Sequence, residues 1–171
     1  MIDVILSLGS NLGDRAQNMR RMEQKIADFL LPPINRSSLM ETEPLGTASD
    51  QQWFYNRIVR GGFSGTPREL LQACVAIEKK LGRTRPYRYA ARTADIDILL
   101  FGELMVNEPD LVVPHPAIQK RRFCIMGLRE IAPEMVFPGG VKRIDDVARE
   151  WEAEASKQKV RIIETRYDKD A

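Results

Sequence analysis

The sequence predicts an α+β fold in which a mainly antiparallel sheet carries packed helices. Short apolar and β-branched runs alternate with two longer segments whose apolar residues recur at helical spacing. The predicted elements follow the order strand, helix, strand, strand, helix, strand, and further elements come after them. This order is that of a ferredoxin-like βαββαβ sandwich with a C-terminal extension. At 171 residues, the chain is expected to form one domain over residues 1–171.

The first half of the chain is expected to form one strand, one helix and two further strands. Residues 2–8 are short, apolar and β-branched, which is typical of a buried strand. Asp14 is expected to cap a helix that runs to about Leu30, where two prolines follow and prevent its continuation. Residues 34–41 are predicted to form a strand, and so are residues 53–59, which are rich in aromatic and β-branched side chains.

The second half opens on the clearest helix signal in the chain. Thr66 is an N-cap residue, Pro67 occupies the first helical position, and Glu69 completes a capping box. This helix is expected to run to Leu81 and to end at the glycine that follows. The later predicted elements are a strand at 95–101, an extended piece at 111–114, a helical turn or two at 123–131, a helix at 144–155 and a strand at 160–163.

Composition and charge exclude several classes of protein. The 26 Lys and Arg residues against 24 Asp and Glu give a net charge of +2, too near zero for a dedicated nucleic-acid clamp. Two cysteines without a CxxC motif and a single histidine exclude a disulfide scaffold and a Cys/His zinc site. No apolar run approaches the length of about 18 residues that a transmembrane helix needs, and the N-terminus lacks the basic region of a signal peptide. The chain is therefore expected to be cytoplasmic, with no nucleic-acid or membrane partner.

Two acidic residues share one face of a predicted strand. Asp95 and Asp97 are two positions apart, which puts their side chains on the same face with Cα atoms about 6.5 Å apart. Two like charges this close raise each other's pKa unless a cation compensates them. Magnesium is often held by one or two carboxylates together with substrate phosphates. The pair therefore indicates a magnesium site, and the alternative is a solvated strand end whose carboxylates pair with nearby arginines.

A basic loop directly precedes this acidic pair. Between residues 83 and 92 the chain carries Arg83, Arg85, Arg88 and Arg92. Guanidinium groups suit the bidentate binding of phosphate oxygens, so these arginines, a polyphosphate and its magnesium would neutralise one another. A solvated basic loop and an RNA contact are the alternatives.

Two further polar residues have competing interpretations. His115 lies between two prolines, which restrict the backbone on both sides, and taken alone it is better explained as a structural histidine. Glu78 lies beside the apolar stripe of the predicted helix, one turn before the basic loop, where a solvated glutamate is the ordinary interpretation.

A set of motifs from residue 8 to about 138 follows the order found in a known enzyme family. The motifs lie at residues 8–13, 42–46, 54–56, 77–78, 82–83, 92–102, 113–116, 121, 123 and 130–134. The most specific are Arg-x-x-Asp-x-Asp at 92–97 and Pro-His-Pro at 114–116. In this order the motifs resemble those of the 6-hydroxymethyl-7,8-dihydropterin pyrophosphokinases, which act in folate biosynthesis.

The resemblance implies an activity, a fold and a set of site residues. It implies that an intact pyrophosphoryl group passes from ATP to the pterin hydroxymethyl oxygen with release of AMP, on a ferredoxin-like fold that holds two Mg²⁺ ions. By resemblance, the metal ligands are Asp95 and Asp97, and the catalytic residues are these two with Arg83 and Arg92. The implied ATP-binding residues are Glu78, Arg83, Arg85, Arg88, Arg92, Ile98, His115 and Arg121. The implied pterin-binding residues are Thr42, Pro44, Leu45, Phe54, Tyr55, Asn56 and Phe123.

The chain also departs from the family's pattern. Many members carry Trp-Gly-Pro where this chain has Tyr89-Ala90-Ala91, which bears on how the basic loop closes. Val75 stands where some members have a polar residue on the ATP side. The motifs lie within residues 1–138, and the extension 139–171 is expected to be structural or to form an oligomer contact in a monomer or weak homo-oligomer. The alternatives to a pyrophosphokinase are a catalytically different or inactive ferredoxin-like nucleotide-binding domain and an RNA-binding module on the same sandwich.

Overall fold

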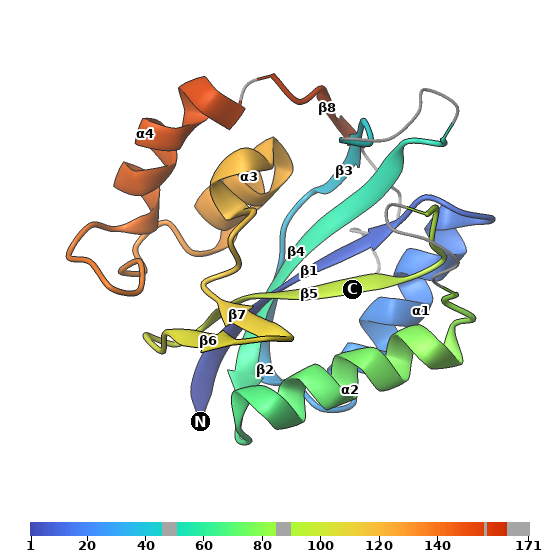
Figure 1. The fold of residues 1–171 in the computed structure, drawn as a ribbon, viewed down its shortest axis with the longest axis horizontal. Helices are drawn as coiled ribbons and strands as arrows, with labels where there is room; N and C mark the ends of the chain where they lie inside the picture. Colours follow the sequence, from blue (N-terminus) through green and yellow to red (C-terminus); the bar gives the residue numbers. More distant parts are fainter. Residues whose placement is uncertain (46–50, 85–89, 156, 164–171) are drawn as a thin grey trace.

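A six-stranded antiparallel sheet forms the centre of the molecule (Figure 1). The computed structural model describes residues 1–45, 51–84, 90–155 and 157–163. Five strands lie in the order β5-β1-β4-β3-β8, and the remaining one, β2, also pairs with β4. The strands are β1 (Ile2–Ser10), β2 (Leu31–Arg36), β3 (Leu39–Thr42), β4 (Phe54–Phe63), β5 (Asp95–Phe101) and β8 (Val160–Ile163).

Helices cover both faces of this sheet (Figure 1). Helices α1 (Arg15–Ala27) and α2 (Pro67–Lys80) lie on one face, and α3 (Arg122–Ile131) and α4 (Ile144–Ala155) lie on the other. Side chains alternate between the two faces along a strand. In β1, Val4 and Leu6 therefore pack in the core under α1 and α2, whereas Ile5 packs in the core under α3 and α4.

The predicted helix starts are confirmed by their caps. Asp14 Oδ1 accepts the N–H of Gln17 at 2.9 Å at the start of α1. Thr66 Oγ1 accepts the N–H of Glu69, whose carboxylate accepts the N–H of Thr66 in return at 2.7 Å. After α2, Gly82 adopts a φ of 77°, the left-handed conformation that favours glycine at a helix end.

The predicted strand at 34–41 is wrong in one respect, because it is interrupted at Ser37 and Ser38. The side-chain hydroxyl of Ser37, in place of a backbone carbonyl, accepts the N–H of Ile58 at 2.9 Å. The N–H of Ser38 donates to the Glu130 carboxylate on α3 at 2.8 Å instead of to a neighbouring strand. These side-chain bonds compete with the sheet and divide the segment into β2 and β3.

Other elements match their predictions or extend them. The strand at 95–101 is β5, and the strand predicted at 53–59 is β4, which continues to Phe63. The apolar segment near 123–131 forms α3, a helix of 10 residues, and the extended piece at 111–114 is β7 (Leu111–Val113). Strand β7 pairs with β6 (Val106–Glu108), which was not predicted, and the 3₁₀ helix η1 (Ile118–Lys120) precedes α3.

The C-terminal segment contributes to the same sheet and core. Strand β8 pairs with β3, with Met40 opposite Ile162. On α4, Ile144 is buried in the core beneath α3, and the ring of Trp151 packs edge-on against that of Phe137 with centroids 5.2 Å apart. Within the described ranges, no helix combines the length and the apolar character that crossing a bilayer requires.

Candidate active site

Strand β5 presents Asp95 and Asp97 on the sheet face that α3 covers. The intervening Ile96 and the following Ile98 are buried in the opposite core, as the alternation of a strand requires. Both aspartates retain access to solvent, with 14% and 27% of their side-chain surface exposed. This arrangement confirms that the two carboxylates share one face.

The first cavity lies over the ends of β1, β3, β4 and β5. Both aspartates line it, and its polar and aromatic lining comes from segments far apart in the sequence. The predicted pterin-binding residues that line it are Thr42, Pro44, Leu45, Phe54, Asn56 and Phe123, and the other lining residues are Ser7, Gly9, Glu43, Arg92, Arg121 and Gln158.

Tyr55 is the predicted pterin-binding residue that the structure places elsewhere. Its neighbours on β4, Phe54 and Asn56, line the cavity, and alternation turns Tyr55 to the other face. There it packs against the core under α1, and the guanidinium carbon of Arg15 lies 3.9 Å from the centre of its ring.

A second cavity lies beside β5, between α2 and the β6–β7 hairpin. Most of its lining residues are apolar, and the predicted ATP-binding residues Ile98 and His115 are part of it. The lining residues are Leu71, Ile96, Asp97, Ile98, Pro109, Asp110, Leu111, Val112, His115 and Pro116. Asp97 lines both cavities and therefore lies at the boundary between them.

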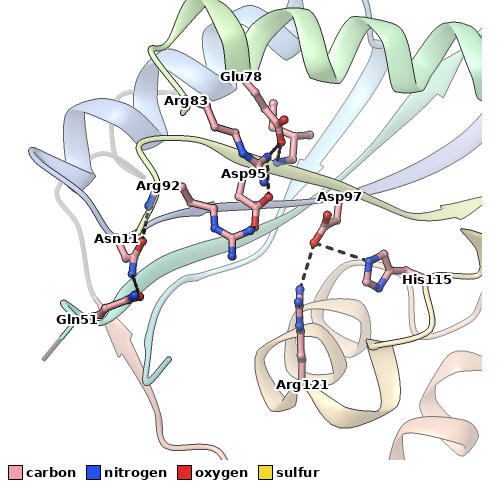
Figure 2. Close-up of polar contacts among 10 residues, drawn as sticks. Asn11, Gln51, Glu78, Arg83, Arg92, Asp95, Asp97, His115 and Arg121 are labelled. Carbon is pink, nitrogen blue, oxygen red and sulfur yellow. Dashed lines mark hydrogen bonds and ion pairs between the residues drawn. The ribbon is translucent and has the colours of Figure 1, made fainter. Parts of the chain in front are cut away.

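Two arginines hold the Asp95 carboxylate (Figure 2). Nη1 of Arg83 lies 2.8 Å from Asp95 Oδ1, and Nη1 of Arg92 lies 2.8 Å from Asp95 Oδ2. The Arg83 side chain is only 5% exposed, whereas that of Arg92 is 23% exposed and lines the first cavity. Arg92 is therefore accessible from the first cavity, whereas Arg83 is a buried partner of Asp95.

Glu78 is a buried anchor, so its interpretation as a solvated helix residue is wrong. Its carboxylate pairs with Arg83 and accepts the N–H of Ile96 at 2.7 Å, which ties α2 to β5 (Figure 2). Its side chain is 8% exposed. Neither Glu78 nor Arg83 is among the lining residues of the two cavities; Arg83 contacts Asp95, and Glu78 contacts the backbone of β5.

Asp97 has its own cationic neighbours on the other side of the site (Figure 2). Arg121 Nη1 lies 3.1 Å from Asp97 Oδ2, and His115 Nε2 lies 3.9 Å from the same oxygen. Burial, together with the neighbouring Asp95 carboxylate, raises the pKa of Asp97 above its ordinary value, although Arg121 and His115 oppose this shift. The site therefore disfavours the carboxylate charge unless further cations are present.

His115 is held in one tautomer when neutral. Burial lowers the pKa of His115 below its ordinary value, against the opposing charge of Asp97. Its Nδ1 accepts the N–H of Ala117 at 3.1 Å, so the proton of the neutral ring lies on Nε2, which is directed toward Asp97. The histidine thus offers a hydrogen-bond donor at the boundary of the two cavities.

The donor set fits magnesium that arrives with a polyphosphate. No group of three or more His, Cys, Asp or Glu side chains suited to a metal occurs in the described part of the chain. Two neighbouring carboxylates on one face can nevertheless hold Mg²⁺ when phosphates and water complete its coordination. The same carboxylates pair with arginines in this structure. Both alternatives from the sequence, a magnesium site and carboxylates paired with arginines, therefore involve these residues.

Asn11 joins two segments of the site and could not be identified from its motif alone. Its Oδ1 accepts the backbone N–H of Arg92 at 2.9 Å, and its Nδ2 donates to Gln51 Oε1 and to the carbonyl of Gln52, both at 3.2 Å (Figure 2). The side chain is buried in the turn after β1. The position of Arg92 therefore depends on a residue about eighty positions away.

The first cavity also depends on a close approach between β1 and β4. Asn56 is buried, and its Nδ2 donates to Thr42 Oγ1 at 2.6 Å. A methyl group on Gly9 would lie 2.8 Å from Asn56 Oδ1, so glycine leaves room for this amide.

The predicted ATP-binding residues Arg85 and Arg88, and also Tyr89, lie outside the described residues.

Comparisons with known proteins agree on one family. The family model described as 7,8-dihydro-6-hydroxymethylpterin-pyrophosphokinase matches residues 5–133. The chain is 38% identical over 144 residues to the 2-amino-4-hydroxy-6-hydroxymethyldihydropteridine pyrophosphokinase of Methylorubrum extorquens, an alignment that covers 84% of this chain and 90% of that protein. It is 39% identical over 131 residues to the Bacillus subtilis protein of the same name, covering 76% of this chain and 78% of that protein.

The fold is also similar to known structures. A crystal structure of wild-type HPPK-DHPS from Plasmodium falciparum with SDX-DHP matches with a TM-score of 0.67 at 15% sequence identity. The alignment covers 91% of this chain and 45% of that chain, so this chain spans less than half of it. At this identity the likeness concerns the fold alone.

Proposed function

This chain belongs to the 7,8-dihydro-6-hydroxymethylpterin-pyrophosphokinase family and transfers pyrophosphate from ATP to 6-hydroxymethyl-7,8-dihydropterin, and we propose that the two cavities beside β5 bind the two substrates. The pterin occupies the first cavity and ATP the second. The observation that carries this assignment is the position of Asp97, which lines both. The pterin hydroxymethyl group and the ATP phosphates therefore meet at this carboxylate.

The reaction needs positioning and charge neutralisation more than covalent chemistry. The hydroxymethyl oxygen forms a bond to the β-phosphorus of ATP and loses its proton to solvent, the bond from that phosphorus to the α–β bridging oxygen breaks, and AMP leaves. Two Mg²⁺ ions on Asp95 and Asp97 would supply neutralisation of phosphate charge and polarisation of the transferred group. Arg92 and Arg121 line the first cavity beside these carboxylates, so they are positioned to stabilise the charge that develops on the phosphates.

The lining of the first cavity suits a flat heterocycle rich in hydrogen-bonding groups. Phe54 and Phe123 supply aromatic surface, and Asn56 supplies an amide that can pair with the amide-like edge of the pterin ring. Thr42, Pro44 and Leu45 form the wall beside them. In the second cavity Ile98 and the other apolar residues suit the adenine ring, and the Nε2–H of His115 faces the phosphates.

The proposal also covers the ferredoxin-like topology, the extent of the domain, the cellular compartment and the oligomeric state. The strand order β5-β1-β4-β3, with α1 and α2 on one face, supports a ferredoxin-like topology. The packing of α4 and β8 on the same sheet and core supports a single domain over residues 1–171. Cys74 and Cys124 are free, buried thiols, as is usual in a reducing cytoplasm. We propose a monomer or weak homo-oligomer.

Product analysis tests this function directly. Incubation with ATP, Mg²⁺ and 6-hydroxymethyl-7,8-dihydropterin is expected to yield AMP and the pterin diphosphate in equal amounts. Removal of the metal with EDTA is expected to stop the reaction, because the phosphate charge then repels the two aspartates. Chromatography of the nucleotides decides the result, and formation of ADP in place of AMP would contradict pyrophosphoryl transfer.

Asn56→Ala is expected to weaken pterin binding by one to two decades. The substitution leaves hydrogen-bonding atoms of the buried ligand unpaired, at a cost of about 1–3 kcal/mol. The affinity for a non-hydrolysable ATP analogue should remain within about twofold, because Asn56 lines the first cavity and is not part of the second. Calorimetry with each ligand measures both effects.

Asn35→Ala is the matched control for Asn56→Ala, because Asn35 is exposed on β2 and lines neither cavity. It is expected to bind both ligands as the unaltered chain does. A loss of ATP binding as large as the loss of pterin binding in Asn56→Ala would mean that the two pockets are wrongly assigned.

A further inference from the structure

Gln158 belongs to the first cavity but lies outside the part of the chain that matches the family model. It precedes β8 and lines the cavity together with Thr42, Glu43 and Phe123. Among the described lining residues it is the one beyond residue 133, where the family match ends. Neither the motifs nor the comparisons therefore assign it a role.

Three hydrogen bonds hold the Gln158 segment against the wall of the cavity. The N–H of Glu43 donates to the carbonyl of Lys159 at 3.2 Å, and the N–H of Lys159 donates to Glu43 Oε1 at 2.8 Å. The side-chain Nε2 of Gln158 donates to the Glu43 carbonyl at 3.3 Å. The adjoining pairing of Thr42 with Val160 continues this contact into the sheet. The amide is thus fixed in place before any ligand binds.

The other half of the Gln158 amide has no hydrogen-bond partner in the described part of the chain. The residue is 4% exposed, and its Oε1 is buried. A buried amide oxygen is normally hydrogen-bonded, and each exception needs an explanation. Because Nε2 is already used by Glu43, the amide cannot turn over without losing that bond. Gln158 lines the first cavity, so this unpaired acceptor belongs to a residue in the wall against which a ligand would lie.

We propose that Gln158 is a substrate-binding residue whose Oε1 accepts a hydrogen bond from an N–H group of the pterin. This inference rests on the proposed placement of the pterin in the first cavity. The ring carries N–H donors, and the pocket already supplies the Asn56 amide and the Thr42 hydroxyl on the neighbouring strands. The C-terminal segment thus contributes a residue to the pterin pocket that lies outside the family motifs.

Gln158→Met is the variant that tests this proposal. It keeps the length of the side chain and removes the acceptor. Its dissociation constant for 6-hydroxymethyl-7,8-dihydropterin is expected to rise about tenfold, as for the loss of one buried hydrogen bond. Its affinity for a non-hydrolysable ATP analogue is expected to change less than twofold, which also shows that the variant is folded. Lys159→Met is the matched control, because the backbone and not the side chain of Lys159 contacts Glu43.

Pterin analogues that each lack one N–H donor show whether Gln158 binds the pterin directly or only holds the Glu43 segment in the cavity wall. The analogue that lacks the donor used by Oε1 is expected to bind the unaltered chain and Gln158→Met equally, because the contact is then absent from both. If Gln158→Met loses the same factor of affinity for every analogue, Gln158 only supports Glu43. That result overturns the proposal. Equal pterin affinity of variant and unaltered chain overturns it as well.

Two further controls keep the result interpretable. If Gln158→Met does not fold, Gln158→Asn retains the amide and withdraws it by one methylene, and the same loss of pterin affinity is expected. Failure of the unaltered chain to bind the pterin would contradict the proposed function itself. Normal binding and AMP formation by the unaltered chain, with no effect of either variant, would contradict only the role of Gln158.

Discussion

Asp97→Asn is expected to lower turnover by about a thousandfold while the protein remains folded. Asp97 lies at the boundary of the two cavities, and its charge is needed to hold magnesium beside the phosphates. The amide has the same shape and still accepts a hydrogen bond from Arg121, so packing is preserved. Steady-state rates of AMP formation at saturating substrates measure the effect. Retention of more than about a tenth of the activity would contradict the metal assignment, since it corresponds to less than ~1.4 kcal/mol of transition-state stabilisation.

The stability of Asp97→Asn gives an independent measurement. The pKa of Asp97 is raised by burial and by Asp95, so its contribution to folding is present at low pH and is lost as the pH rises through the folded-state pKa. At neutral pH, without ligands, the variant is therefore expected to melt at the same temperature as the unaltered chain or above it.

Magnesium with an ATP analogue should raise the melting temperature of the unaltered chain and have little effect on Asp97→Asn. Asp146→Asn, at an exposed position on α4, is the matched control and should respond as the unaltered chain does. A large loss of stability in Asp97→Asn without ligands would show that the carboxylate is structural.

Arg92→Ala is expected to lower kcat by about a thousandfold, with a much smaller change in the affinity for the ATP analogue. The guanidinium lies beside Asp95 on the wall of the first cavity, and its carbon lies 5.8 Å from the centre of the Phe54 ring. A cation fixed at this place acts mainly on charge that develops as the pyrophosphoryl group moves, and comparable arginines contribute factors of about 10³ to 10⁵. Steady-state kinetics and calorimetry separate the two quantities.

Arg60→Ala is the matched control for Arg92→Ala. Arg60 forms ion pairs with Asp3 and Glu134 and lines neither cavity, so its loss should affect stability and leave kcat within about twofold. If Arg92→Ala raises the KM for ATP and leaves kcat unchanged, Arg92 serves ground-state binding and not the transition state.

The local sequence by itself determined most of the elements and the chemistry of the central motif. The caps at Asp14 and Thr66 act within one helical turn, so they could be predicted without knowledge of the fold. The shared face of Asp95 and Asp97 follows from the geometry of any strand. The split of one predicted strand at Ser37 could not be found in this way, because the bonds that cause it come from β4 and α3.

The tertiary structure alone decided which residues reach the cavities and which support them. Glu78 and Arg83 are buried because α2 packs on the start of β5. The spacing of apolar residues in α2 does not predict this contact. Tyr55 turns away from the cavity because the register of β4 against β1 assigns its neighbours to that face. Gln158 reaches the pocket because β8 pairs with β3, more than a hundred residues earlier in the chain. Periodicity and motifs report contacts within a turn or a strand, whereas these positions depend on pairing between distant segments, which only the assembled sheet establishes.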